Sequence, residues 1–433
     1  PANSIYDISL RNITMDDALK DSNIKWRLYK NNTLLSSGNF SPSFDVMENN
    51  RMVLTTTQQD LTTTASTYVF LMWISESCTG DIANCTNSDN QFKYVGKSFS
   101  FNIKLETATK SKKDLTRKAS ATGTIVNLYN NATKTSVTNN SITYQYDTTH
   151  SLMKDVGGNI RYYGASPNNY IYFNCSDYSN QSSSTCETWR IIGVFDGRIK
   201  LIRGSQIGSY SWDNKNTSTG AESNYGKNDW TDARLMKLLN PSYESETTGG
   251  SLYYNAKSGN CYAGQNNATT TCNFTSTGIK NDTTRNLISN TTYYLGGWNS
   301  TSVYPNQIYE YERGTTVYTE RPTIWQGKIA LPYPSDYGYA TDLGKCSQTL
   351  YNYDDSICTS NNWMKSILAP NYGWLLTTSS SDSYSTWPVG SRGFVGSGIT
   401  YNTYGIVPVL SLSSELSIKA GTGSSSAPYQ LSV

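Results

Sequence analysis

Residues 189–203 read WRIIGVFDGRIKLIR and concentrate apolar side chains in a chain whose mean hydropathy is −0.53. Asp196 and Gly197 form a pair typical of a two-residue type I′ turn, because both turn positions need a positive φ. The register set by this turn pairs Val194 with Ile199, Ile192 with Leu201 and Ile191 with Ile202. Both faces of the hairpin are then apolar, which predicts a central strand pair rather than an exposed edge.

The same register places Arg190 opposite Arg203. Two like charges directly opposed are unfavourable unless a carboxylate or a ligand anion lies between them. We favour a structural carboxylate, so the stretch is predicted to be core rather than the wall of a catalytic cleft.

The composition narrows the classes of protein that fit. The 433 residues include 35 basic and 33 acidic side chains, a net charge of +2, so the basic surface of a nucleic-acid binder is not expected. The many Tyr, Ser, Thr, Asn and Gly residues suit strands joined by polar turns. The longest apolar run, 68–74, is too short to span a bilayer, and no direct membrane insertion is expected. No signal peptide is recognisable, so we expect residue 1 to begin a mature or trimmed chain.

The eight cysteines fall into four couples that are close in sequence, each enclosing a short polar loop. Local disulfides are the favoured interpretation, because zinc sites need CxxC spacing or histidines, and the chain has one histidine and no CxxC. Disulfides indicate an oxidising, extracellular location, at the cell surface or beyond it. The predicted bonds are Cys78 with Cys85, Cys175 with Cys186, Cys261 with Cys272, and Cys346 with Cys358.

Three parts are predicted along the chain: an antiparallel β-sandwich at 1–108, a basic linker at 109–124 and a mixed α+β domain at 125–433. In the first part, strands are expected at 4–10, 25–29, 52–56, 67–75 and 99–105, with Asn31 and Asn32 supplying a turn. The linker is rich in basic residues and almost free of apolar ones, so a solvated tether is expected. Its basic residues are Lys110, Lys112, Lys113, Arg117 and Lys118.

The third part is predicted to be rich in strands, with short helices. Thr231 caps a predicted helix that Pro241 stops. Weaker helices, again beginning with capping residues, Asn281 and Asn361, are expected at 281–289 and 361–368. Further strands are expected at 328–331, 374–377 and 405–412. The whole chain is therefore predicted to be mainly β with an α+β portion.

Candidates for catalysis are few. His150 is the only imidazole and no GxSxG motif occurs, which leaves a surface histidine as the favoured interpretation. Glu310 and Glu312 alternate onto one face of a predicted strand and could serve a carboxylate-based hydrolase, but Arg313 and Arg321 favour ion pairing. A hydrolase would have a raised pKa for one of these two glutamates in an open cleft.

No cofactor is expected, although two loops offer oxygen ligands for structural calcium. Asp213-Asn214-Lys215-Asn216 and Asn352-Tyr353-Asp354-Asp355 place carboxylates and amides close together. Neither loop matches a complete calcium-ligand pattern.

Aromatic residues among small polar ones mark a candidate binding surface. Such rings can meet the apolar face of a sugar while neighbouring polar groups supply hydrogen bonds, although strand-capping aromatics give the same pattern. The candidate ligand-binding residues are Tyr384, Trp387, Arg392, Phe394, Tyr401 and Tyr404.

Motifs spread over 125–433 resemble a C-terminal domain of uncharacterised surface and prepilin-type proteins of Gram-positive-type bacteria. They include CSDYSNQSSSTCETWRIIGVFDGRIKLIR, NDWTDARLMKLLNPSYES, WQGKIALPYPSDYGYATD and GIVPVLSLSSELSIKAGTGSSSAPYQL. Their order also resembles the C-type-lectin-like fold shared with sulfatase-modifying-enzyme-like domains. The chain departs from prepilins in lacking their long apolar N-terminal helix. The first 108 residues resemble sandwich modules of bacterial surface proteins.

This resemblance implies a display or binding module. We therefore expect a secreted, non-enzymatic surface protein with a structural or adhesive role, such as a pilin-like fibre subunit. Its copies would associate when the segment 1–13 or an exposed edge strand pairs with a neighbour's sheet. The alternative is a monomeric adhesin that binds host or microbial glycans through the aromatic residues above.

Overall fold

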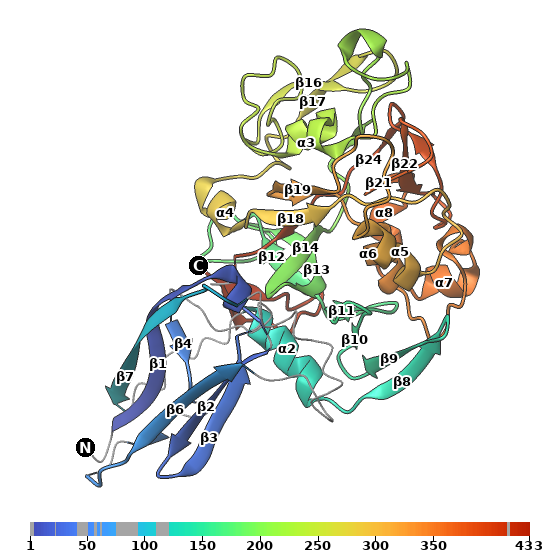
Figure 1. The fold of residues 1–433 in the computed structure, drawn as a ribbon. Helices are drawn as coiled ribbons and strands as arrows, with labels where there is room; N and C mark the ends of the chain where they lie inside the picture. The colour runs from blue at the N-terminus through green and yellow to red at the C-terminus, as the bar shows by residue number, and fades with distance from the viewer. Residues whose placement is uncertain are drawn as a thin grey trace. The chain divides into compact units, whose positions relative to one another are not determined.

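The computed structural model describes residues 4–21, 23–40, 51–55, 59–60, 63–74, 94–109, 121–413 and 416–433 (Figure 1). The chain divides into two compact units, Pro1–Gly123 and Thr124–Val433. Most of the predicted basic linker, including its five basic residues, lies outside the described residues. Strands dominate both units, so the prediction of a mainly β chain with an α+β portion is confirmed.

The first unit contains two antiparallel sheets. Strand β1 (Ser4–Met15) lies at the centre of one sheet, with β7 (Phe99–Thr109) along one side of it and β4 (Arg51–Val53) and β5 (Gln59–Asp60) along the other. The second sheet has the order β3-β2-β6. Its strands are β2 (Ile24–Lys30), β3 (Thr33–Asn39) and β6 (Tyr68–Ile74), and a 3-10 turn, η1 (Asp17–Leu19), follows β1.

The two sheets share one apolar core, as a β-sandwich requires. Alternate residues of β1 and β2 supply this core, because successive side chains of a strand point to opposite faces. Asn31 and Asn32 form the turn between β2 and β3 with positive φ, as predicted. The buried core includes Tyr6, Ile8, Leu10, Ile24, Trp26, Leu28 and Met52.

The hairpin of residues 189–203 forms at the predicted turn. Strands β13 (Glu187–Phe195) and β14 (Arg198–Arg203) are joined at Asp196 and Gly197, which have φ values of 49° and 70°. Val194 pairs with Ile199, as predicted, but the register shifts between Ile191 and Gly193. Ile191 therefore faces Leu201, and Trp189 rather than Arg190 faces Arg203, so the pairs predicted beyond the bulge are wrong.

This hairpin is central in a nine-stranded sheet (Figure 1), which confirms its predicted place. The sheet has the order β20-β25-β14-β13-β11-β10-β9-β8, and β12 also pairs with β13. The remaining strands are β8 (Thr135–Asn139), β9 (Ile142–Asp147), β10 (Leu152–Lys154), β11 (Ile160–Tyr162), β12 (Tyr170–Phe173), β20 (Ile329–Ala330) and β25 (Val409–Ser411).

Smaller sheets complete the strands of the second unit. A five-stranded sheet contains β15 (Ser209–Ser211), β24 (Thr403–Gly405), β21 (Gly373–Thr378), β22 (Ser385–Val389) and β23 (Gly398–Ile399). The two-stranded sheets are β16 (Ser258–Tyr262) with β17 (Thr269–Asn273), β18 (Thr291–Tyr294) with β19 (Ile324–Gly327), and β26 (Ser417–Ala420) with β27 (Gln430–Ser432).

The described helices are short. They are α2 (Ala121–Asn131), α3 (Arg234–Leu239), α4 (Asp282–Leu287), α5 (Pro305–Glu312), α6 (Pro334–Tyr339), α7 (Ser356–Ser360) and α8 (Lys365–Leu368), with 3-10 turns at Thr217–Thr219, Trp230–Asp232 and Leu350–Asn352. Asn281 caps α4 through the amide of Thr284, as predicted. The predicted cap at Thr231 is wrong, because Asp229 accepts from the Thr231 amide and begins a 3-10 turn before α3.

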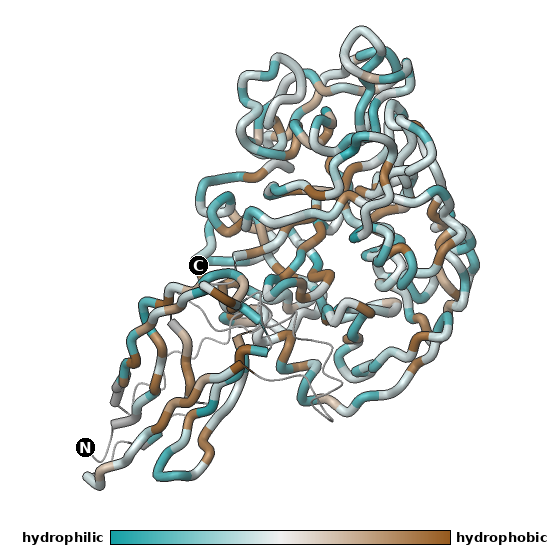
Figure 2. The backbone as a smooth tube through the Cα atoms, in the orientation of Figure 1, coloured by the Kyte–Doolittle hydropathy of each residue, from teal (hydrophilic) through white to brown (hydrophobic). Residues whose placement is uncertain are grey.

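The apolar residues of the second unit gather along its central strands, whereas the loops around β16 and β17 are mostly polar (Figure 2). Three of the predicted cysteine couples are disulfide-bonded: Cys175–Cys186, Cys261–Cys272 and Cys346–Cys358. Cys78 and Cys85 lie outside the described residues. Within the part of the chain that is described, no helix is both long and apolar enough to cross a bilayer.

Candidate functional site

The edge of strand β7 exposes apolar side chains that belong to the core face of its sheet. Ile103 pairs with Leu10, and Leu105 pairs with Ile8, and both β1 partners are buried. Paired residues of neighbouring strands point to the same face, so Ile103 and Leu105 point to the core side. They are nevertheless 58% and 49% exposed. The core face of the sheet therefore continues past the region that the opposing sheet covers.

The side of β7 that faces away from β1 has no partner among the described strands. Among the described strands, β7 pairs only with β1, and β6 pairs only with β2. Phe70 of β6 and Phe101 of β7 contact each other edge to face, with ring centroids 5.8 Å apart. The two edge strands therefore lie at the same side of the sandwich. Unpaired edges of this kind present backbone groups to a further strand.

The segment 1–13, which is predicted to pair with a neighbour's sheet, is paired within its own unit from Ser4 onward. Residues from Ser4 onward form β1, whose two sides are both paired. Removing this segment would remove the central strand of the sheet. Within the described chain these residues pair inside their own sheet, so β7, β6 and β3 are edges that a neighbour could extend.

Trp387 belongs to the core rather than to a binding surface. It lies in β22, is 2% exposed and packs in the main apolar cluster of the second unit. The ligand-binding role predicted for this side chain is therefore wrong. The alternation of small and aromatic residues in this segment marks a buried strand here.

The other predicted aromatic residues form two separate groups near the surface. Tyr384 and Tyr401 both contact Tyr225, with centroid distances of 5.1 and 6.1 Å, and Tyr225 is 43% exposed. Tyr225 did not stand out in the sequence because it lies far from the 384–404 segment.

The second aromatic group centres on Tyr372. Tyr404 stacks on Tyr372 at 4.8 Å, and Phe394 meets Tyr372 edge to face at 6.3 Å. Arg392 is exposed, lies 5.7 Å from the Phe394 ring and is 3.5 Å from Asp354. Tyr404 also packs on the buried Trp374, so this group is more firmly anchored than the first.

Glu310 and Glu312 lie on helix α5, not on the predicted strand, because Pro305 at the first helical position favours a helix. Glu312 is fully buried, accepts hydrogen bonds from the amide and hydroxyl of Ser335, and lies 3.3 Å from Arg313. Burial raises the pKa of Glu312 to about 7, against the opposing effects of Arg313 and Ser335. The raised pKa therefore arises in the core and not in an open cleft. The predicted partner Arg321 pairs with Glu222 instead.

A buried ion network crosses the centre of the second unit and had no local signature in the sequence. Arg161 donates to Asp155 at 2.5 Å and to Asp336 at 2.8 Å, and Lys200 donates to Asp336 at 2.5 Å. Burial alone would raise the pKa of Asp336, but Lys200 and Arg161 hold it below its ordinary value. Each charge in this network has an opposite charge in contact, as a structural network requires.

The remaining predicted site residues have protein partners. His150 is half-buried, with Nδ1 2.7 Å from an Asp147 carboxylate oxygen. Asp213 is buried and accepts from the ammonium of Lys215 and from the backbone amides of Lys227 and Arg234. Asp355 caps α7. Asp354 faces Arg392. The aspartates of both predicted calcium loops therefore already interact with nitrogen groups of the protein.

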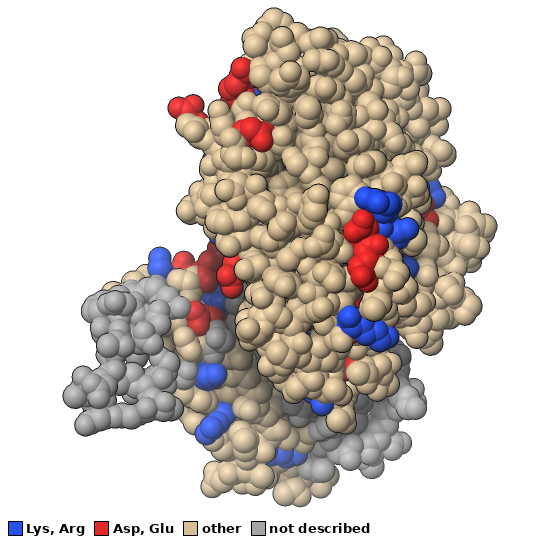
Figure 3. Space-filling model, turned by 90° about the vertical axis from the view of Figure 1, so that its right-hand side faces the viewer, with Lys and Arg blue, Asp and Glu red and all other residues tan. Residues whose placement is uncertain are grey.

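Charged side chains are sparse on the face drawn in Figure 3, where acidic and basic groups lie next to one another. Comparison of the chain with protein-family models, with curated proteins and with solved structures finds no match.

Proposed function

We propose that the chain is a secreted, non-enzymatic surface component whose copies associate through the edge of strand β7. The observation that supports this proposal most is the half-exposure of Ile103 and Leu105 on the core side of β7, whose outer edge pairs with none of the described strands. A strand added to this edge would extend the sheet and shield those side chains from water. Backbone hydrogen bonds would supply affinity without a special sequence.

A second copy of β7 is the occupant that the charges favour. In an antiparallel pair with its two-fold axis at Leu105, Lys104 of each copy faces Glu106 of the other, which also forms an ion pair with Arg11 of its own copy. Leu105 faces Leu105 across the axis. Opposite charges and apolar residues in direct register each stabilise a strand pair. The pair is isologous, as most two-fold protein interfaces are.

Strand β6 lies at the same side of the sandwich as β7, and its edge is also unpaired among the described strands. A two-fold partner at β7 would therefore lie next to the exposed Val69, Leu71 and Trp73 of β6 as well. This contact alone gives a pair, and a fibre would need a second contact elsewhere on the chain. The three disulfides support a location outside the reducing cytosol, as does the resemblance to bacterial surface proteins.

The test of this proposal is the association state of an edge variant. The double substitution I103K/L105K places two charges on the proposed interface, where the side chains are exposed and folding should be little changed. We expect analytical ultracentrifugation to show dimers or larger species for the wild type and monomers for the variant. The control L34K changes an exposed leucine of β3 in the same sandwich and should associate like the wild type. A monomeric wild type, or a variant that still associates, would contradict the proposal.

A second candidate function is glycan binding at Tyr225, Tyr384 and Tyr401. The exposure of Tyr225 beside two further rings favours it, because a flat ring can meet the apolar face of a sugar. The pair Y225A/Y401A should lose glycan-array signals that the wild type shows. Y351A, which removes another exposed tyrosine, should keep them. An array without signals for the wild type argues against this function.

A further inference from the structure

A cavity of about 430 Å³ opens in the second unit beside the pair of strands β12 and β13. Its volume falls in the range of small-molecule sites, about 300 to 1,000 Å³. Its polar lining includes Tyr170, Glu187, Arg190, Arg203, Ser205 and Ser366. None of these residues belongs to the β7 edge or to the tyrosine groups.

One of the two arginines in this cavity is fully engaged by the protein. Arg203 donates from Nε and Nη2 to the two carboxylate oxygens of Glu187, at 3.0 and 3.3 Å. Its Nη1 donates to the hydroxyl and carbonyl oxygens of Ser205, at 2.8 and 3.0 Å. Glu187 is thus the carboxylate expected beside the arginines, but it neutralises only Arg203.

The other arginine has no acidic partner among the described residues. Arg190 is 7% exposed, and its side chain donates to the amide oxygen of Asn169 at 2.5 Å and to the carbonyl of Pro167 at 3.3 Å. The Tyr170 ring lies 3.7 Å and the Trp363 ring 4.8 Å from the guanidinium carbon. Nη1 has no protein acceptor in the described part of the chain. The cavity therefore holds two guanidinium groups and one carboxylate, an excess of one positive charge.

Burying a charge without a counter-ion costs free energy, and this cost favours the neutral form of the side chain. Burial lowers the pKa of Arg190 to about 10, with only Tyr170 opposing the shift. By contrast, the buried Arg161 meets two carboxylates. Arg190 is thus held by neutral groups through Nε and Nη2, and the two N–H groups of Nη1 are left for an anion from outside.

We propose that this cavity binds a hydroxylated carboxylate, of the class of the acidic sugars, with its carboxylate on Nη1 of Arg190. A single unpaired guanidinium matches a monoanion, and the nearby Glu187 disfavours a dianion such as phosphate. Ser205 and Ser366 bring hydroxyl groups to the same cavity, which suits a ligand with several hydroxyls. This inference does not depend on association through β7.

The experiment is calorimetric titration of the full chain with N-acetylneuraminic acid and with glucuronic acid, each compared with neutral N-acetylglucosamine. We expect at least one acidic sugar to bind and the neutral sugar not to bind. R190Q should weaken binding about tenfold or more, because a charge-assisted hydrogen bond is lost. S366W should also abolish binding, since it fills the cavity from an exposed position of α8 while keeping Arg190.

A control variant and a second cavity variant accompany R190Q. K154Q removes an exposed lysine of the same unit and should bind like the wild type. If R190Q does not fold, S366W still tests the cavity. Absence of binding by both acidic sugars, equal binding of the neutral sugar, or unchanged binding in S366W would overturn the inference.

Discussion

Neighbouring aromatic residues of the 384–404 segment have different surroundings, and their contributions to stability should differ accordingly. Trp387 is enclosed by the core of the second unit, whereas Tyr401 is half-buried beside Tyr225. We expect W387A to lower the free energy of unfolding by about 3 to 5 kcal/mol. Y401A should cost less than about 1 kcal/mol. Urea denaturation measures both, and equal losses would contradict the assignment of Trp387 to the core.

Glu312 should make stability depend on pH near neutrality. Its pKa in the folded protein is about 7, above the ordinary value of 4.5. Between these two values the folded state holds the proton more tightly than the unfolded state, so the free energy of unfolding falls as pH rises. The fall should reach roughly 3 kcal/mol once the pH exceeds the folded value.

The variant E312Q isolates this effect, because it has no proton to lose. Thermal melts at several pH values should show the wild type losing stability relative to E312Q between about pH 4.5 and pH 7. Contributions from other titrating groups, including Asp336, are shared by both proteins. Profiles that run parallel would show that Glu312 is already ionised in the folded state.

Single residues could be predicted from sequence only where their partners are close along the chain. Asn281 as a helix cap and the cysteine couples are of this kind, because each partner lies at most twelve positions away. The ion pair of Arg161 with Asp336 and the contact of Tyr225 with Tyr384 join distant segments. Arg190 shows the same limit: the sequence predicts a carboxylate between Arg190 and Arg203 from a register that is wrong, and the structure places Glu187 on Arg203 alone.

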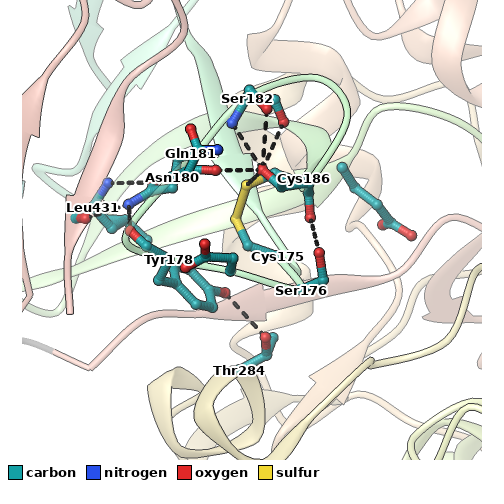
Figure 4. The surroundings of a disulfide bond; sticks show 12 residues. Cys175, Ser176, Tyr178, Asn180, Gln181, Ser182, Cys186, Thr284 and Leu431 are labelled. Carbon is teal, nitrogen blue, oxygen red and sulfur yellow. Dashed lines mark hydrogen bonds between the residues drawn. A yellow bond between two sulfur atoms is a disulfide. The ribbon is translucent and has the colours of Figure 1, made fainter.

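At the scale of elements, the loop closed by Cys175–Cys186 links the central sheet to the C-terminal hairpin (Figure 4). Gln181 of this loop donates to the carbonyl of Leu431 and accepts from its amide. Tyr178 bonds to the Thr284 hydroxyl at the start of α4. The disulfide therefore positions a loop that holds strand β27 in place.

The double substitution C175A/C186A should loosen this hairpin more than the rest of the unit. Loss of a native disulfide costs about 2 to 4 kcal/mol. We expect faster hydrogen exchange in β26 and β27, with β13 and β14 less affected. The control C261A/C272A removes a bond of the same spacing in another hairpin and should leave β27 protected. Equal deprotection of β27 in both variants would contradict the proposed anchor.

Whole elements were predictable where local signals were strong. The Asp196-Gly197 turn sets the pairs of the hairpin next to it, but the bulge farther along lies beside β11. The backbone of β11 approaches Gly193 so closely that a Cβ at this position would lie 2.1 Å from the Ile160 carbonyl oxygen. The YEYE segment alternates like a strand, yet Pro305 ahead of it begins a helix. Local sequence patterns do not show which strand lies at the edge of a sheet. The exposure of Ile103, for example, depends on how far the opposing sheet covers it.

For the molecule as a whole, the near-neutral net charge of +2 makes apolar contact and backbone pairing the main contributions to the proposed association through β7. Salt should therefore weaken the association only slightly, through the two Lys104–Glu106 contacts. We expect sedimentation at about 0.01 M and about 1 M NaCl to give dissociation constants within roughly tenfold of each other. A steep loss at high salt would indicate an interface built on charge instead.

The most direct test of association through β7 is a site-specific crosslink. In the proposed register Leu105 faces Leu105 of the partner, while the two copies of Ile103 lie about 13 Å apart along the strands. Under mild oxidation L105C should form a covalent dimer and I103C should not, because a disulfide needs Cα atoms within about 7 Å. We expect a dimer band for L105C alone. Equal crosslinking of both variants, or none, would refute association through β7.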